Sequence, residues 1–303
     1  MSGQLSIRWI EKKMNQYMNK MLKTESIDYV VASDTDSIYV EMDSIVKTLG
    51  DADDLVVVEA LDKFIEAKVQ PFIDKCYQEL ADMMCAYQQK MKMKRETIAN
   101  KGIWRGKKMY ILNAWNVEGV QYETPKLKMS GIEAVRSSTP HACRENIKKA
   151  FGIVMNGDQA ELLNFIDQFR NNFMSLPFED VAFPRGVKGM SKYRDNATIY
   201  KKGTPIQVKG ALLFNHIIKT KGIKNTPPIQ DGDKIRFAYL KMPNPIQDSV
   251  IATPDELPEE FNLDKYIDRD TQFDKAFLDP VRSITNIIGW EVEQKSTLES
   301  FFS

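Results

Sequence analysis

Residues 27–40 read IDYVVASDTDSIYV. Two short runs rich in β-branched and aromatic residues, 29–32 and 38–40, flank the polar residues 33–37. This pattern predicts a β-hairpin with the polar residues at its tip. Asp34 and Asp36 would point to opposite faces of an ideal strand, but at a turn both can approach one cation. Carboxylate oxygens are the ligands that Mg²⁺ prefers, so the hairpin tip is a candidate metal site.

An Asp-x-Asp triplet is a weak signal when it stands alone. The same spacing occurs in haloacid dehalogenase type phosphatases, in nucleotide-sugar transferases and in ordinary polar turns. A phosphatase of that type would also need a lysine and a downstream acidic pair in a parallel βαβ plan, and the sequence has no such pattern. The residues around the hairpin must therefore identify the chemistry.

The segments outside the hairpin mix helical and strand patterns. Apolar residues such as Ile10, Met14 and Met18 have helical spacing and predict an amphipathic helix ending near Leu22. A long helical region is expected from Asp54 to Met91, with a kink or break at Pro71. Short strands are expected over 95–99, 107–116 and 120–122, with a turn at 118–119.

The second half of the chain is predicted to be mostly helical. Thr139 followed by Pro140 is a good helix start. Helices are expected over 141–155, 159–174, 211–219 and 263–288, loops with short strands over 184–209, and a strand pair around 235–240. Helices beside short strands that follow one another along the chain predict an α+β fold.

Composition limits the classes of protein that the chain can represent. With 303 residues and 43% hydrophobic content it can form two domains or one large one. No run approaches the roughly 20 apolar residues of a membrane span, and the N-terminus lacks the plan of a signal peptide, so no membrane partner is expected. Cys76, Cys85 and Cys143 lack the spacing of a zinc or redox motif and are predicted to be reduced core residues.

The net charge is zero, with 42 basic and 42 acidic residues, but the charges are segregated. Basic residues gather between 88 and 128 and again between 185 and 224. Trp104, Tyr110, Tyr193 and Tyr200 lie among them. Blocks of like charge are often only solvated faces, yet basic blocks that contain aromatic residues also suit a phosphate-binding surface.

The hairpin residues Asp34-Thr35-Asp36-Ser37 resemble motif C of family B DNA polymerases. Residues 95–99 (RETIA) are similar to the palm strand of that family that carries a glutamate beside the metal site. Residues 106–110 (GKKMY) are similar to its Lys-x-Tyr motif. Residues 126–133 (KLKMSGIE) with 137–140 (SSTP) resemble the palm-to-thumb junction of T-even phage polymerases. Four motifs in the family's order make chance an implausible explanation.

This resemblance implies a function and a set of site residues. Asp36 and its companion Asp34 would bind catalytic Mg²⁺, and Glu96 would tune that site from beside it. The DNA-binding residues would be Lys107, Lys108, Tyr110, Lys126 and Lys128. The chain would then be the C-terminal part of a replicative DNA polymerase, transferring nucleotides from dNTP to a primer-template in the cytoplasm of an infected bacterial host.

The resemblance also implies a domain order. Residues 1–137 would form the C-terminal part of the palm, an antiparallel sheet with helices. Residues 138–292 would form a mostly helical thumb, and residues 293–303 a tail. Ala32-Ser33 departs from the Tyr-Gly usual before the first motif C aspartate, which puts the packing beneath the primer end in doubt.

Motif A, motif B and the acidic exonuclease motifs of the family are absent from this sequence. A two-metal site needs carboxylates from both motif A and motif C. The resemblance therefore implies an N-terminal polymerase part, with exonuclease, motif A and fingers, as a partner. A truncated fragment and a polymerase encoded as two polypeptides both fit, and Met1-Ser2-Gly3 at a structural boundary favours the second. A non-catalytic DNA-binding and clamp-tethering module is the alternative.

The last residues, 295–303, read KSTLESFFS. They can be a frayed end, but two phenylalanines at a polar terminus are costly to expose unless a partner buries them. The segment resembles the clamp-binding tail of replicative polymerases, which implies that Leu298, Phe301 and Phe302 bind a sliding clamp. The glutamine that usually leads this motif is displaced, since Gln294 stands one position early.

Overall fold

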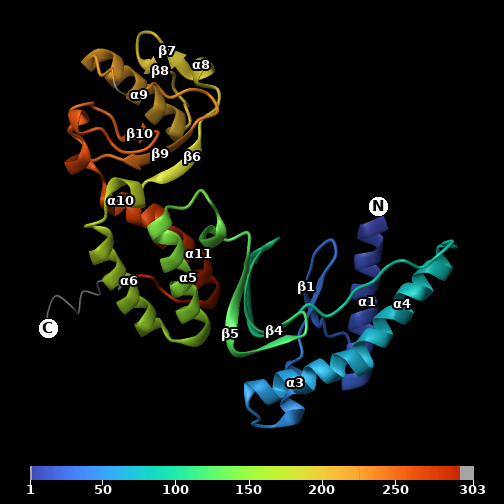
Figure 1. Cartoon of the computed structure of the whole chain (residues 1–303). Coiled ribbons are helices and arrows are strands. Elements are labelled where there is room, and N and C mark those ends of the chain that lie inside the picture. The colour runs from blue at the N-terminus through green and yellow to red at the C-terminus, as the bar shows by residue number, and fades with distance from the viewer. Residues whose placement is uncertain (1, 225, 294–303) are drawn as a thin grey trace. The chain divides into compact units, whose positions relative to one another are not determined.

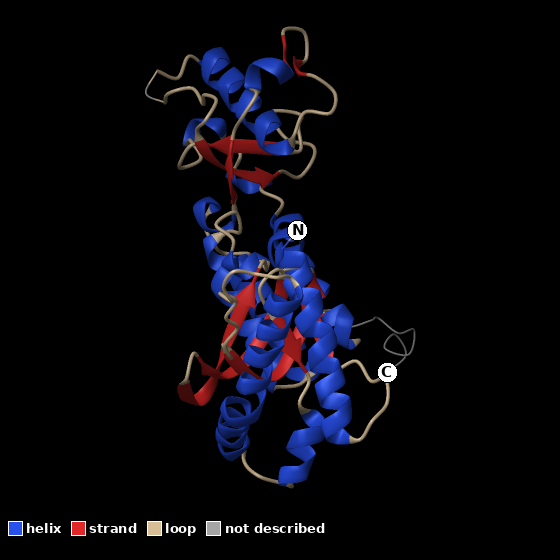
Figure 2. Ribbon diagram, turned by 90° about the vertical axis from the view of Figure 1, so that its right-hand side faces the viewer, coloured by secondary structure: helices blue, strands red, loops and turns tan. Residues whose placement is uncertain are grey.

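A computed structural model describes residues 2–224 and 226–293. The chain divides into two compact units, Met1–Met129 and Ser130–Ser303 (Figure 1). The boundary expected from the sequence, between 137 and 138, lies inside the second unit. Each unit has its own helices and its own antiparallel strand pairs (Figure 2). The α+β prediction is therefore confirmed.

The first unit begins with α1 (Ser2–Leu22) and the hairpin of β1 (Val30–Ser33) and β2 (Ile38–Val40), both as predicted. The apolar face of α1 packs against α4 (Gln70–Met83), burying Met14 and Met18 completely. Asn15 lies on the same helix, and its Oδ1 accepts hydrogen bonds from the backbone N–H groups of Tyr29 and Val30. One polar side chain thus fastens the start of the hairpin to α1.

The long helical region is built from several pieces. They are α2 (Asp43–Val46), a 3-10 turn (Lys47–Leu49), α3 (Asp54–Phe64), a π-helical turn (Ile65–Val69) and α4. Pro71 follows this π turn directly, and Val69 and Gln70 before it keep helical dihedrals, so the predicted kink or break is a π turn within a continuous helix.

The prediction of helix as far as Met91 was wrong. The helix ends at Met83, and residues 86–96 form no helix or strand. Cys85 has a positive φ of 51°, which a continuing α-helix does not allow. Cys85 is also exposed, so the expectation of three core cysteines holds only for Cys76 and Cys143.

The sheet of the first unit has the order β3-β4-β5, from β3 (Thr97–Gly106), β4 (Met109–Val117) and β5 (Val120–Ser130). β3 and β5 are longer than predicted. Lys107 and Lys108 form the turn between β3 and β4 rather than part of a strand, and Lys108 has a φ of 60°. The predicted turn at Glu118 and Gly119 is confirmed, and both residues have a positive φ, as two-residue hairpin turns require.

The second unit contains a helical layer with an aromatic core. Its longer helices are α5 (His141–Asn156) and α6 (Gln159–Phe173), followed late in the chain by α10 (Arg269–Phe273), a π turn (Asp274–Leu278), α11 (Asp279–Thr285) and a 3-10 turn (Asn286–Ile288). Phe169 stacks edge-on against Phe277 at 4.8 Å, and Phe173 against Phe273 at 5.2 Å. These rings join the early and late helices of the unit.

A three-stranded antiparallel sheet, ordered β10-β9-β6, completes the second unit. Its strands are β6 (Phe183–Gly186), β9 (Lys234–Tyr239) and β10 (Val250–Thr253), and α9 (Ile206–Lys221) packs on β10. The smaller elements are α7 (Phe178–Val181), α8 (Met190–Tyr193), β7 (Arg194–Asp195), β8 (Ile199–Tyr200) and 3-10 turns over Glu133–Val135, Glu259–Phe261 and Asp264–Tyr266. Among the residues described, no helix has the length and apolarity to cross a membrane.

Candidate active site and DNA interface

The tip of the β1-β2 hairpin is organised around Asp34. Its backbone N–H donates to the carbonyl of Ser37 at 2.9 Å, which closes the turn. Its Oδ1 accepts from the backbone N–H of Thr35 at 2.7 Å and from the Thr35 hydroxyl at 3.2 Å. The backbone bond is the largest cause of a lowered pKa of Asp34, and the hydroxyl, Lys108 and Lys107 act in the same direction. These contacts therefore stabilise the ionised form of Asp34, in which its carboxylate can bind a cation.

Asp36 lies exposed beside Asp34 in the same turn. The hairpin itself is braced from α1, because the hydroxyl of Ser33 donates to Glu11 at 3.0 Å. The two aspartates thus sit on a short, anchored turn and face solvent. Such a turn can offer hard oxygen ligands to a divalent ion without first unpacking a core.

The structure brings the basic turn of the β3-β4 hairpin to this acidic tip. Nζ of Lys108 lies 3.9 Å from Oδ2 of Asp34. Tyr39, on β2, packs edge-on against Trp104 at 5.3 Å and against Tyr110 at 5.5 Å. Burial, followed by contact with Tyr110, raises the pKa of Tyr39. An aromatic cluster therefore fixes the distance between Asp34 and the turn of Lys107 and Lys108.

Glu96 is near this cluster but is directed to another partner. Its carboxylate pairs with Lys128, which also donates to the hydroxyl of Thr97 at 3.1 Å. Among residues 2–224 and 226–293, no group of three His, Cys, Asp or Glu side chains is arranged to hold a metal. The structure thus does not join Glu96 to Asp34 and Asp36 in one cluster.

The predicted site residues not yet described are Lys126 and the residues of the C-terminal tail. Lys126, on β5, places its Nζ 4.0 Å from the centre of the Tyr122 ring, and Figure 1 shows β5 in the same sheet as β4. The tail residues Leu298, Phe301 and Phe302 lie outside the described residues.

Sequence reasoning missed three supporting residues. Tyr39 carries the aromatic contact between the two hairpins, and Asn15 holds the base of the first. Arg95 donates to Asn116 and pairs with Asp62, which ties the start of β3 to α3. Asn15 was detectable as a polar residue on the apolar side of a helix, but the partners of Tyr39 and Arg95 are too distant in sequence to be recognised.

Comparison of the sequence with known proteins finds two relatives. No family model matches the chain. The chain is 32% identical to a DNA-directed DNA polymerase of Enterobacteria phage T4 and 32% identical to one of Escherichia phage RB69. Each alignment covers 99% of this chain and 35% of the relative, so the chain spans about a third of the length of these relatives. Over nearly all of its length, this chain is a relative of one part of the family B DNA polymerases of the T-even phage type.

Proposed function

We propose that this chain is the C-terminal portion of a replicative DNA-directed DNA polymerase. It supplies metal-binding aspartates and a grip on primer-template DNA for template-directed nucleotidyl transfer from dNTP. The observation that carries the proposal is the 3.9 Å approach of Lys108 to Asp34, in a chain 32% identical to two phage polymerases. An acidic turn beside a basic turn suits a reaction in which a phosphate must be held next to cations.

The residues of the tip fit Mg²⁺. Asp34 and Asp36 offer charged oxygens, and Oδ2 of Asp34 is paired with Lys108, whose side chain is 65% exposed, so a hard cation can displace the lysine. When bound, Mg²⁺ supplies charge stabilisation for the attacking and leaving oxygens. Asp36 is the principal ligand in this proposal, Asp34 is its companion, and Glu96, which is paired with Lys128, would tune the site from beside it.

The site needs a further carboxylate, and within residues 2–224 and 226–293 no third acidic side chain joins Asp34 and Asp36. Two aspartates without a third acidic residue cannot clamp both metals of a two-metal site. We therefore assign the missing carboxylate to an N-terminal polymerase part, carrying motif A, the fingers and the exonuclease, which corresponds to the length of the relatives that this chain does not span. The chain is expected to be inactive without that part.

The DNA grip is assigned to Lys107, Lys108 and Tyr110 at the basic turn, with Lys126 and Lys128 on the neighbouring strand. These residues would bind backbone phosphates and the edge of the duplex, which makes affinity salt-dependent. The tail residues Leu298, Phe301 and Phe302 are proposed to bind a sliding clamp, which would tether the grip to DNA.

Primer extension tests the proposal. The chain alone should bind primer-template DNA without extending it, and adding the N-terminal part should restore extension. In that pair, Asp36→Ala should lower the rate about a thousandfold, because losing a metal ligand costs on the order of 4 kcal/mol in the barrier. Asp51→Ala, on the exposed loop before α3, is the matched control and should keep the rate. Full activity of Asp36→Ala, with DNA binding intact, would favour a non-catalytic clamp-tethering module.

A further inference from the structure

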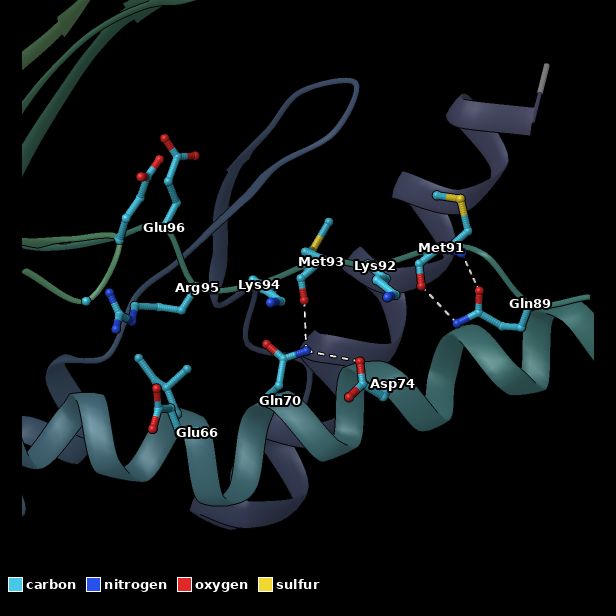
Figure 3. A pocket seen from close by; sticks show the side chains of 13 residues that line it. Glu66, Gln70, Asp74, Gln89, Met91, Lys92, Met93, Lys94, Arg95 and Glu96 are labelled. Carbon is cyan, nitrogen blue, oxygen red and sulfur yellow. Dashed lines mark hydrogen bonds between the residues drawn. The ribbon is translucent and has the colours of Figure 1, made fainter.

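A groove of about 990 Å³ runs along the first unit between the α4 helix and the segment that leads into β3 (Figure 3). One wall carries Glu66 and Asp74 on the helical side, whereas Glu118 lies beside Glu96, to whose carbonyl its backbone N–H donates at 2.7 Å. The other is the segment 89–96, which is neither helix nor strand. Neither the two aspartates of the hairpin tip nor the residues assigned to the DNA grip line this groove. Glu96, the ion-pair partner of Lys128, does line it.

Side-chain contacts hold this segment in place. Gln70 donates from Nε2 to the carbonyl of Met93 at 2.8 Å, and the Tyr77 hydroxyl lies 4.0 Å from the Met93 sulfur. Met93 also packs against the buried core beside α1. Gln89 donates to the carbonyl of Met91 at 2.8 Å. The segment is therefore fixed before any ligand arrives, which reduces the entropy lost on binding.

Its lysines recur at every second residue. Lys90, Lys92 and Lys94 are exposed, and Figure 3 shows the side chains of Lys92 and Lys94 turned away from that of Met93. None of the three lysines forms an ion pair with any residue in the described ranges 2–224 and 226–293. Figure 3 shows the backbone between Gln89 and Glu96 passing α4 without a helical turn, so lysines at every second position are spread along one line of positive charge.

An aromatic ring stands at one end of this line. Tyr87 has a relative exposure of 105%, and Met84 beside it is 57% exposed. Aromatic side chains usually contribute to a protein by packing in its core, which Tyr87 does not do. The face of its ring is therefore free to stack on a ligand. Stacking of unpaired bases on aromatic rings, together with a row of cations along the backbone, is how proteins hold single strands without reading their sequence.

We propose that residues 87–94 bind single-stranded DNA, with Lys90, Lys92 and Lys94 on successive phosphates and Tyr87 stacked on an unpaired base. The single line of lysines matches one phosphate backbone. The wall opposite, with Glu66 and Asp74, would repel the second backbone of a duplex. This function is additional to the primer-template grip, which uses other residues, and would keep an unpaired strand on the same unit.

The test is the binding of a fluorescently labelled oligothymidylate to the whole chain, measured by anisotropy across a salt series. In K90A/K92A/K94A, the slope of log affinity against log salt should fall by about two, since each single-strand phosphate contact contributes about 0.7. Affinity at 0.1 M salt should fall roughly ten- to a hundredfold. K47A/K68A/K75A removes three exposed lysines from the same unit and should change neither quantity.

Tyr87 separates stacking from charge. Tyr87→Ala should weaken oligothymidylate binding roughly tenfold with an unchanged salt slope, whereas Tyr87→Phe keeps the ring and should bind as the unmodified chain does. Circular dichroism and thermal unfolding should be the same for all variants, since these side chains are exposed.

Two results would overturn the proposal. One is a lysine triple variant that binds oligothymidylate as tightly as the matched control. The other is a triple variant that keeps oligothymidylate binding but loses association with the N-terminal polymerase part, which would make the segment a protein-docking surface. Binding is measured without catalysis, so failure of the polymerase proposal, seen in primer extension, remains distinguishable from failure of this one.

Discussion

Asp248→Asn tests the polar contact that fastens the sheet of the second unit to α9. The Asp248 side chain is only 8% exposed, and it accepts from Nζ of Lys209 at 2.6 Å and from the hydroxyl of Tyr200 at 2.5 Å. The Asp248 carboxylate also accepts a third hydrogen bond, from the backbone N–H of Ser249 at 2.6 Å. Burial alone would lower the pKa of Lys209, but the bonds to Asp248 and Tyr200 outweigh it and the pKa is raised.

The cost of Asp248→Asn in free energy of unfolding depends on the charge of Lys209, which the substitution leaves without its partner. Removing one partner of a buried ion pair costs roughly 3–5 kcal/mol, because the other charge stays buried without compensation. Here the Lys209 side chain is 22% exposed, so water can reach it, and asparagine keeps one acceptor oxygen. We therefore expect a loss of about 2–3 kcal/mol in the free energy of unfolding. For a unit of this size that corresponds to a fall in Tm of about 4–12 °C.

Calorimetry of the whole chain would measure this change. Asp255→Asn is the matched control, since Asp255 is 89% exposed and lies 3.8 Å from Arg236, and it should cost less than about 0.5 kcal/mol. Because the pKa values of Lys209 and Tyr200 are both raised on folding, their contribution is complete below about pH 10 and is lost as pH rises further. Equal Tm values for Asp248→Asn and Asp255→Asn would refute the reasoning.

Three further predictions concern the grip, the packing and the tail. Lys108→Ala should lower the salt slope of primer-template binding by about one, as a gel-shift titration across salt would show, and an unchanged slope would remove Lys108 from the grip. Gly210→Ala should destabilise the chain by about 1–2 kcal/mol in urea unfolding, because a Cβ there would lie 2.9 Å from Ala252 and overpacking outweighs the gain in helix propensity. Gly186→Ala, which has open space around it, is the control and should cost much less. Deleting residues 298–303 should leave distributive synthesis by the reconstituted pair unchanged and abolish its stimulation by a sliding clamp, and clamp-dependent long products from the truncated pair would contradict this.

The sequence predicted those features that depend on neighbouring residues. The β1-β2 hairpin follows from two apolar runs around a polar centre, and α1 follows from helical spacing. The end of α4 was missed because Met84, Met91 and Met93 prolong an apolar pattern past Cys85, whose backbone leaves the helical region. The pattern therefore placed Met84 and Met91 on a helix, although both side chains are exposed.

Features that depend on distant partners could not be predicted in this way. A strand pair was expected around 235–240, but the structure has one strand there, Lys234–Tyr239, and its partners Phe183–Gly186 and Val250–Thr253 are identified only by the fold. The approach of Lys108 to Asp34 is of the same kind, since no periodicity relates residues so far apart. Family resemblance assigned Asp34 to the metal site and Lys108 to the DNA grip, whereas their approach and the aromatic contacts of Tyr39 that maintain it came only from the structure.

The basic turn has two opposing effects on the acidic tip under the proposed function. Lys107 and Lys108 help to keep Asp34 ionised, which a cation ligand requires, yet Lys108 at 3.9 Å also competes for the same carboxylate oxygen. Lys108 is 65% exposed, so this ion pair is weak and solvent-screened. A DNA phosphate that draws Lys108 away would leave Oδ2 of Asp34 to a metal. Grip and metal binding would then favour each other, because the lysine that holds the DNA no longer occupies the ligand.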